Sequence, residues 1–144
     1  AAYLTTAFVV AGIGAFYLKR PFRVSAEYMK GKGMIFQGQH APQAMFNDYK
    51  AEGGYIEGAY FIPNTPFELQ LRYDTYERNV DQPNKATFDT WTAGVQYHFN
   101  KKTRLKVNYA IRNFEAPNFA SGAGPNANLD GVDNRLAIEL THIF

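Results

Sequence analysis

Residues 67–76 read Phe67-Glu68-Leu69-Gln70-Leu71-Arg72-Tyr73-Asp74-Thr75-Tyr76, a run in which apolar and polar side chains alternate. Successive side chains of a β-strand point to opposite faces of its sheet. Phe67, Leu69, Leu71 and Tyr73 therefore share one face, and Glu68, Gln70, Arg72 and Asp74 share the other. This stretch predicts a strand with one apolar and one polar side.

The same alternation recurs along the chain and predicts about seven strands. It is clear in residues 22–28, 91–99, 105–112 and 136–144. In residues 54–62 it is weaker, with Ile56, Gly58, Tyr60 and Ile62 opposing Tyr55, Glu57, Ala59 and Phe61. Residues 3–18 are apolar on both sides, and the even positions are slightly more so: Phe8, Val10, Phe16 and Leu18. No segment shows a helical period, so the chain is predicted to be all-β.

The predicted connections alternate between two lengths. Tight turns with proline, asparagine or lysine occupy residues 19–21, 63–66 and 100–102. Long polar connections occupy roughly residues 32–50, 78–87 and 115–132. Transmembrane β-barrels have short turns on the periplasmic side and long loops outside. With the C-terminus in the periplasm, every connection falls on its expected side.

Aromatic residues collect beside the predicted short turns, on the apolar face. Outer-membrane barrels carry such rings at the level of the lipid headgroups. A soluble β-sandwich, by contrast, buries its aromatic residues centrally. We expect a membrane girdle formed by Phe22, Tyr60, Phe67, Tyr97, Phe99 and Phe144.

A soluble antiparallel barrel would show the same alternation of side chains. The alternating connections, the aromatic residues at strand ends and the terminal Phe144 favour an antiparallel transmembrane β-barrel. Seven is an odd number of strands, and a sheet in lipid cannot leave an edge unpaired. Either preceding strands are missing from this sequence, which we favour, or other chains complete the wall. Residues 1–144 are then one transmembrane β-barrel segment, the C-terminal portion of the barrel.

Four segments resemble the closing half of the phosphate-selective porin O/P family. They are Pro21-Phe22-Arg23-Val24-Ser25-Ala26-Glu27-Tyr28, Gly54-Tyr55-Ile56-Glu57-Gly58-Ala59-Tyr60-Phe61, Leu69-Gln70-Leu71-Arg72-Tyr73 and Leu105-Lys106-Val107-Asn108-Tyr109. The resemblance covers most of the chain from about residue 15, and it rests on the order and spacing of these segments. It implies a 16-stranded barrel, usually trimeric, that passes small anions across the outer membrane of a Gram-negative bacterium. The family's anion-binding loop lies outside this stretch, so no binding residue is carried over.

The last predicted strand resembles the C-terminal signature that outer-membrane proteins present to the barrel-assembly machinery. It ends in Phe144, with Leu136, Ile138 and Leu140 on the same face, although His142 stands where an aromatic residue is usual. The expected partners are therefore outer-membrane lipid, the assembly machinery and two further copies in a homotrimer.

The polar face is predicted to line a water-filled pore. By strand parity its charged residues include Arg23, Glu27, Arg72, Asp74, Arg104, Lys106, Arg112, Arg135 and Glu139. Basic rings bias a pore toward anions and acidic rings toward cations. The two signs nearly balance, which predicts weak selectivity, with Arg104, Lys106 and Arg112 on one strand as a candidate basic track. Alternatively, these charges pair with acids on neighbouring strands.

Other classes of function find little support. The formal net charge of +2 and the lack of a basic stripe argue against nucleic acid, and the absence of cysteine excludes disulfides and thiolate metal sites. The histidines have no metal-ligand spacing, and no serine has a histidine partner in sequence. We expect no enzyme and no cofactor. The predicted function is a porin for passive diffusion of small hydrophilic solutes, with anions or phosphate as candidates. The alternatives are a non-conducting outer-membrane barrel acting as a scaffold, adhesin or subunit of a larger envelope complex, and a soluble barrel that binds an apolar ligand.

Overall fold

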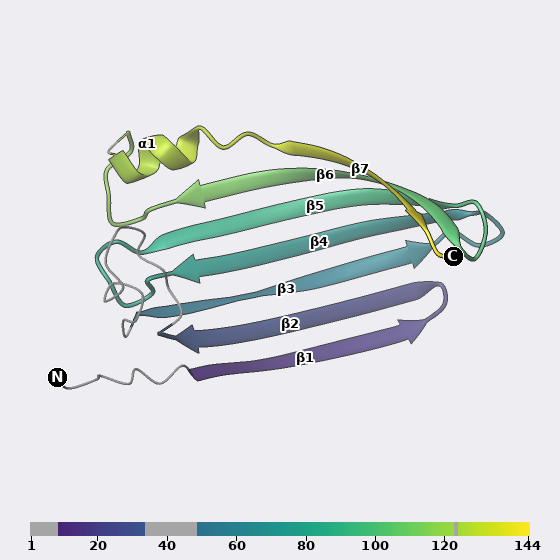
Figure 1. Ribbon diagram of the computed structural model, residues 1–144, viewed down its shortest axis with the longest axis horizontal. Coiled ribbons are helices and arrows are strands. Elements are labelled where there is room, and N and C mark those ends of the chain that lie inside the picture. The colour runs from purple at the N-terminus through teal and green to yellow at the C-terminus, as the bar shows by residue number, and fades with distance from the viewer. Residues whose placement is uncertain (1–8, 34–48, 123) are drawn as a thin grey trace.

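The computed structural model describes residues 9–33, 49–122 and 124–144, which form one antiparallel sheet of seven strands in chain order (Figure 1). The strands are β1 (Val9–Lys19), β2 (Phe22–Lys32), β3 (Lys50–Phe61), β4 (Phe67–Arg78), β5 (Ala86–His98), β6 (Thr103–Glu115) and β7 (Arg135–His142). Each predicted strand is present, which confirms the all-β antiparallel fold class. The predicted residues 3–8 of the first segment lie outside the described residues.

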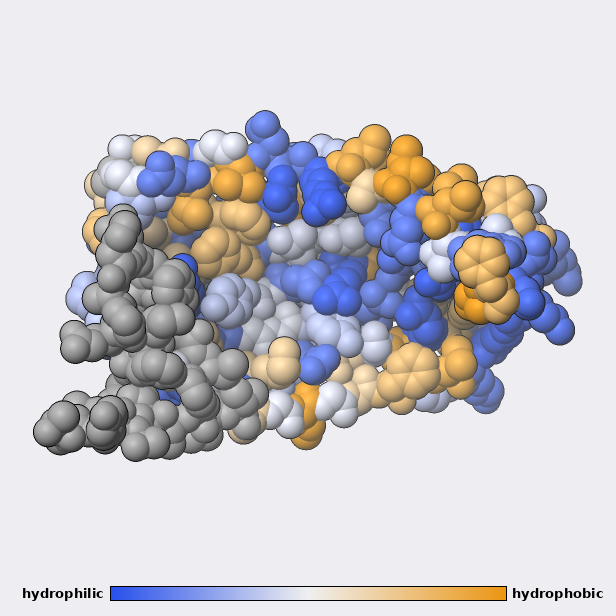
Figure 2. All heavy atoms as spheres, viewed as in Figure 1, coloured by the Kyte–Doolittle hydropathy of each residue, from blue (hydrophilic) through white to orange (hydrophobic). Residues whose placement is uncertain are grey.

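The pairing register keeps the two kinds of side chain apart. Directly opposed residues of neighbouring strands share a face. Leu69 of β4 lies opposite Tyr60 and Val95, whereas Arg72 lies opposite Glu57 and Thr92. The sheet consequently has one apolar and one polar face, and in Figure 2 polar residues fill the middle of the visible face.

Burial in this sheet is the reverse of that in a soluble protein. Among the described residues, the buried apolar side chains are only Ala59 and Ala116, whereas Leu71 and Ile138 are 53% and 69% exposed. Several polar residues are buried instead: Glu57, Glu68, Asn79, Gln96 and Asn126. A soluble barrel would place its large apolar side chains in an interior, so this distribution favours a sheet with lipid on its apolar face.

The connections alternate as predicted. Short turns join β1 to β2, β3 to β4 and β5 to β6 at one end of the sheet, and the described long connections, from β4 to β5 and from β6 to β7, lie at the other end (Figure 1). Backbone hydrogen bonds tie neighbouring short turns to the sheet: Phe61 N donates to Pro21 O over 2.7 Å, and His98 N donates to Pro66 O over 2.9 Å. Asn64 adopts the left-handed conformation (φ 60°) that its tight turn requires.

No segment of the sequence shows a helical period, yet the described residues of this all-β fold include one short helix. The long connection between β6 and β7 contains the helix α1 (Gly124–Asp130). Seven residues make only two turns, too few to show a helical period in the sequence. Pro125 suits the first turn, where its missing N–H costs no hydrogen bond. Within the described residues, no helix is long and apolar enough to traverse a membrane.

The face of β1 also differs from the sequence pattern. Leu18 lies opposite Arg23 and Phe16 lies opposite Ser25, so the slightly more apolar even positions share the polar face. Ile13 and Tyr17, at odd positions, lie on the apolar face opposite Tyr28 and Val24. A strand that is apolar on both sides has no internal signal for orientation, and its pairing with β2 decides it.

Candidate functional site: the polar face of the sheet

The register places the whole predicted pore-lining set on the polar face. These residues are Arg23, Glu27, Arg72, Asp74, Arg104, Lys106, Arg112, Arg135 and Glu139. They come from β2, β4, β6 and β7, and β3 adds Glu57 between them. That this face lines a pore stays a prediction, but the charges on it fall into two distinct groups.

The first group is a network of ion pairs across β2, β3 and β4. Arg23 Nη1 lies 2.7 Å from Glu57 Oε1, and Arg23 Nη2 lies 2.8 Å from Glu68 Oε1. Arg72 Nη1 lies 3.7 Å from the second oxygen of Glu57, and Arg72 Nε donates to Asp74 Oδ1 over 2.8 Å. Each arginine therefore contacts two carboxylates, and its charge is largely neutralised.

Glu68 is the most buried acid of this network. Its side chain is 4% exposed, and its second oxygen lies 3.0 Å from His98 Nε2. A carboxylate withdrawn from water requires partners that replace its hydration. Arg23 and His98 provide them from the two sides.

The second group of charges lies on β6 and β7 and lacks acidic partners. In the described part of the chain, no carboxylate comes within 4.0 Å of Arg104, Lys106 or Arg135. Lys106 faces Glu139 in the register, but Glu139 Oε1 instead accepts a hydrogen bond from Thr141 Oγ1 over 2.9 Å. Pairing with neighbouring acids thus holds for Arg23 and Arg72 and fails for Arg104 and Lys106.

Arg112, the third member of the candidate basic track, is bound to the connection that follows β6. Its Nη2 donates to the main-chain oxygen of Asp133, and its backbone N donates to Asn134 Oδ1 over 3.1 Å. Its guanidinium carbon lies 5.9 Å from the centre of the Phe114 ring. The sequence pattern therefore located this cation on the correct face but did not foresee its link to the long connection.

The aromatic residues predicted as a girdle gather on the apolar face near the short turns. Ring centres are 5.2 Å apart for Phe22 and Tyr60, 5.1 Å for Phe67 and Tyr97, and 4.8 Å for Tyr97 and Phe99. The sixth, Phe144, follows the end of β7 and packs on His142 at 4.9 Å. A role at the membrane surface stays a prediction.

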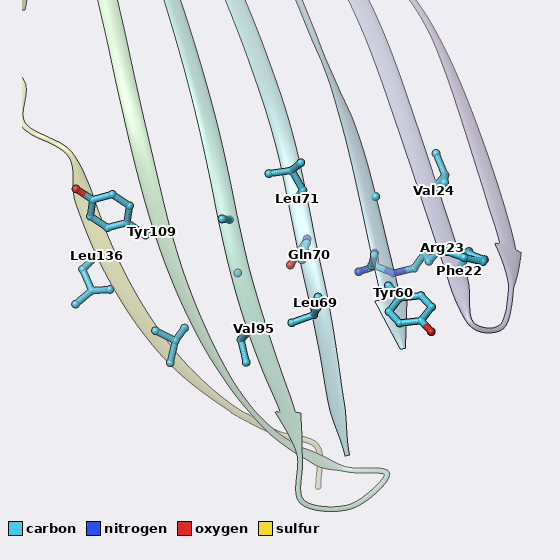
Figure 3. Close-up of a pocket in the computed structure, with 15 residues that line it drawn as sticks. Phe22, Arg23, Val24, Tyr60, Leu69, Gln70, Leu71, Val95, Tyr109 and Leu136 are labelled. Atoms are coloured by element: carbon cyan, nitrogen blue, oxygen red, sulfur yellow. The ribbon is translucent and has the colours of Figure 1, made fainter. Parts of the chain in front are cut away.

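An open apolar hollow of about 720 Å³ lies on the same face (Figure 3). Leu69, Leu71 and Val95 border it, and the small residues Gly58 and Ala93 form part of its floor. Almost all of its side chains are apolar, which fits a surface that meets hydrocarbon and not a site for a polar solute.

Comparison with known families agrees with this geometry. The family model of phosphate-selective porins O and P matches residues 3–116. The chain belongs to this family. No curated protein and no solved structure gives a significant match. The porin family consists of outer-membrane channels and not of enzymes. The match confirms the resemblance to this family that the sequence analysis described.

Membership of a porin family explains the reversed burial of the sheet. Porin barrels place apolar side chains against lipid and polar side chains against a water-filled interior. The matched residues end at Ala116, so the long connection with α1 and the strand β7 lie beyond the match. Glu57 and Glu68, which strand parity also places on the polar face, hold the centre of the ion-pair network in this porin.

Proposed function

We propose that this porin chain forms part of the wall of a water-filled outer-membrane channel in a Gram-negative bacterium. The channel passes small hydrophilic solutes by passive diffusion and prefers anions. The observation that carries the proposal is the split of charges on the polar face. Arg23 and Arg72 are neutralised by carboxylates, whereas Arg104, Lys106 and Arg135 have no acid within ion-pair distance among the described residues.

The consequence of this split is electrostatic. A cation held between two carboxylates adds little to the potential in the pore, whereas an unpaired cation acts on any ion that passes within about 8 Å at physiological ionic strength. A count of charges alone predicts weak selectivity, because it treats every residue equally. The pairing pattern favours a positive potential along β6 and β7, which is the basis of the preference for anions.

The test is the reversal potential of the purified full-length porin in a planar bilayer under a potassium chloride gradient. We expect a potential of the sign that indicates chloride preference, and a smaller one for Arg104→Gln and Lys106→Gln. Lys101→Gln is the matched control, because it removes the same charge from the exposed turn between β5 and β6. Cation preference in the wild-type channel, or equal effects of all three variants, would refute the proposal.

A complete lack of conductance would favour the alternative, a non-conducting barrel that acts as a scaffold, an adhesin or a subunit of a larger envelope complex.

The same purified porin can be used to test how the chains assemble. We propose that residues 1–144 form one segment of the barrel wall, that the porin is a homotrimer in outer-membrane lipid, and that its last strand is recognised by the barrel-assembly machinery. A mass measured for the detergent-solubilised porin that differs from three chains would contradict the trimer.

A further inference from the structure

The polar face changes character at its long-loop end, where three rings form an aromatic row. Tyr76 of β4 lies opposite Phe88 of β5, which lies opposite Phe114 of β6. The ring centres are 5.8 Å apart for Tyr76 and Phe88, and 5.1 Å apart for Phe88 and Phe114. The row crosses three strands at one level, so it presents aromatic rings on the face that carries Arg23, Arg72 and Lys106.

The connection between β6 and β7 covers part of this row. Phe119, Pro125 and Leu129 from the connection enclose, together with Phe88 and Ala116, a cavity of about 300 Å³. Since Phe88 lies on the polar face, the connection folds over this face and not over the apolar one. Arg78, Asn79 and Asn84 also line the cavity and give it a polar side.

The covering segment is fixed by side-chain hydrogen bonds. The buried Asn126 accepts a hydrogen bond from Ala116 N over 2.7 Å. Its Nδ2 lies within 3.0–3.2 Å of three main-chain oxygens, those of Ala116, Phe119 and Ala120. Asn118 Nδ2 donates to Pro83 O over 3.1 Å and so joins this connection to the one between β4 and β5. These hydrogen bonds hold the connection in place over the cavity.

Cations flank the aromatic row and the cavity. Arg78 lines the cavity, and the guanidinium of Arg112 lies over Phe114, hydrogen-bonded to the neutral main-chain oxygen of Asp133. Two acids at this end of the sheet lie beside lysines: Glu77 is 2.8 Å from Lys85, and Asp81 is 3.2 Å from Lys50. The hydrogen bond from the Lys50 ammonium lowers the pKa of Asp81.

We propose that the cavity and the aromatic row bind small organic anions that carry a flat ring, such as an aryl carboxylate. The rings of Phe88 and Phe119 contact the ring of the solute, and the neighbouring arginines attract its charge. The site selects among the anions that reach this mouth of the pore. The inference depends on the proposed function only in that the polar face is taken to line the pore.

The test measures equilibrium binding to the purified full-length porin in detergent, with fluorine NMR as the method of detection. The probe is 4-fluorobenzoate, and trifluoroacetate serves as an anion without a ring. We expect saturable binding of the fluorobenzoate and much weaker binding of the trifluoroacetate. Phe119→Ala should weaken fluorobenzoate binding roughly fivefold, because it removes one aromatic contact. Phe119 is 37% exposed, so this variant keeps the fold.

The matched control is Phe61→Leu, which alters a polar-face ring at the opposite end of β3, beside His98. It should leave fluorobenzoate binding unchanged. Equal binding of the two anions, or wild-type affinity in Phe119→Ala, would overturn the inference. Phe88→Leu provides a second variant, expected to weaken binding by a similar factor without removing the apolar bulk at this position.

Failure of this inference can be told apart from failure of the proposed function, because binding is measured without conduction. A porin that conducts anions but binds both probes equally would refute only the aromatic site. A porin without conductance, whose fluorobenzoate binding is lost in Phe119→Ala, would refute the channel and support the site. Blocking of the open channel by benzoate added on the long-loop side, and not by acetate, would support both.

Discussion

Single residues show how a sheet with a buried polar face becomes stable. Glu68 is 3% exposed, yet both its oxygens have polar partners, the Arg23 guanidinium at 2.8 Å and the His98 ring nitrogen Nε2 at 3.0 Å. Removal of one partner from a buried ion pair costs more than the pair itself contributes, because the remaining charge stays desolvated. The packing of this face consequently depends on electrostatic matching between strands instead of apolar contacts.

Glu68→Gln should lower the free energy of unfolding by about 2 kcal/mol, a value reduced from that of a fully buried pair because Arg23 is partly exposed. Urea unfolding of the porin in lipid vesicles measures the change. Glu27→Gln is the matched control, since Glu27 lies on the same face but has no ion pair among the described residues. Equal losses in the two variants would contradict the role given to the network.

At the scale of elements, the sequence predicted the strands, whose side chains alternate regularly. It missed the helix α1, whose position depends on a few long-range contacts. The residues of β4 alternate from Phe67 to Asp74, so its two faces followed directly, whereas the strand continues to Arg78 with Tyr76 on the polar face. β5 begins at Ala86, whereas the predicted strand began at Trp91. The sequence pattern missed the first residues of β5 because Phe88 lies on the polar face and Asp89 on the apolar face, which reverses the alternation.

The parts of the site that could not be predicted have the same cause. Strand parity assigned the charged residues to one face, but it does not measure distances, so it could not separate the paired Arg72 from the unpaired Lys106. Strand parity is enough to place Tyr76 on the polar face with Arg72. It cannot predict that Phe119 lines the cavity, because that depends on how the connection with α1 folds back over the sheet. The position of α1 follows from Asn126, and no periodic signal reports that contact.

Asn126→Ala should loosen the connection between β6 and β7 while the sheet stays intact. The change leaves several main-chain groups without their partner, among them Ala116 N and Phe119 O. Hydrogen exchange should become at least tenfold faster in residues 117–131, a factor that corresponds to about 1.4 kcal/mol of local stability. Asn128→Ala, an exposed position of the same helix, should leave exchange unchanged. Faster exchange throughout β6 would instead show that Asn126 stabilises the whole sheet.

At the scale of the whole molecule, the two faces and the two ends of the sheet carry different kinds of side chain. The apolar face exposes large side chains and gathers rings near the short turns, as a surface in lipid does. On the polar face, Arg23 and Arg72 pair with carboxylates, whereas Arg104, Lys106 and Arg135 have no acid within ion-pair distance in the part of the chain that the structure describes. The long-loop end adds rings and a fixed connection. The proposed charge selection and the proposed ring recognition therefore fall on different parts of the same sheet.

This division predicts that removal of an acid from the paired side changes selectivity in the opposite sense to removal of a base from the unpaired side. Asp74→Asn takes away the nearer of the two carboxylates beside Arg72 and leaves only Glu57 at 3.7 Å, so the polar face gains one net positive charge. One added charge acting over about 6 Å of water contributes roughly 0.7 kcal/mol before screening. We expect the ratio of chloride to potassium permeability, obtained from the reversal potential, to rise about twofold once screening is included.

The matched control for this experiment is Asp89→Asn, which removes the same charge at nearly the same height from the apolar face, where Asp89 accepts a hydrogen bond from Tyr73. If the polar face lines the pore, the control leaves the permeability ratio unchanged, because lipid and the sheet itself separate Asp89 from the permeating ions. If both variants raise the ratio equally, the two faces meet the same solvent, and the assignment of the polar face to the pore is wrong. Asp74→Asn combined with Lys106→Gln should return the permeability ratio close to the wild-type value. The first change removes a negative charge and the second removes a positive charge from the same face of the sheet, so their effects on the pore potential cancel.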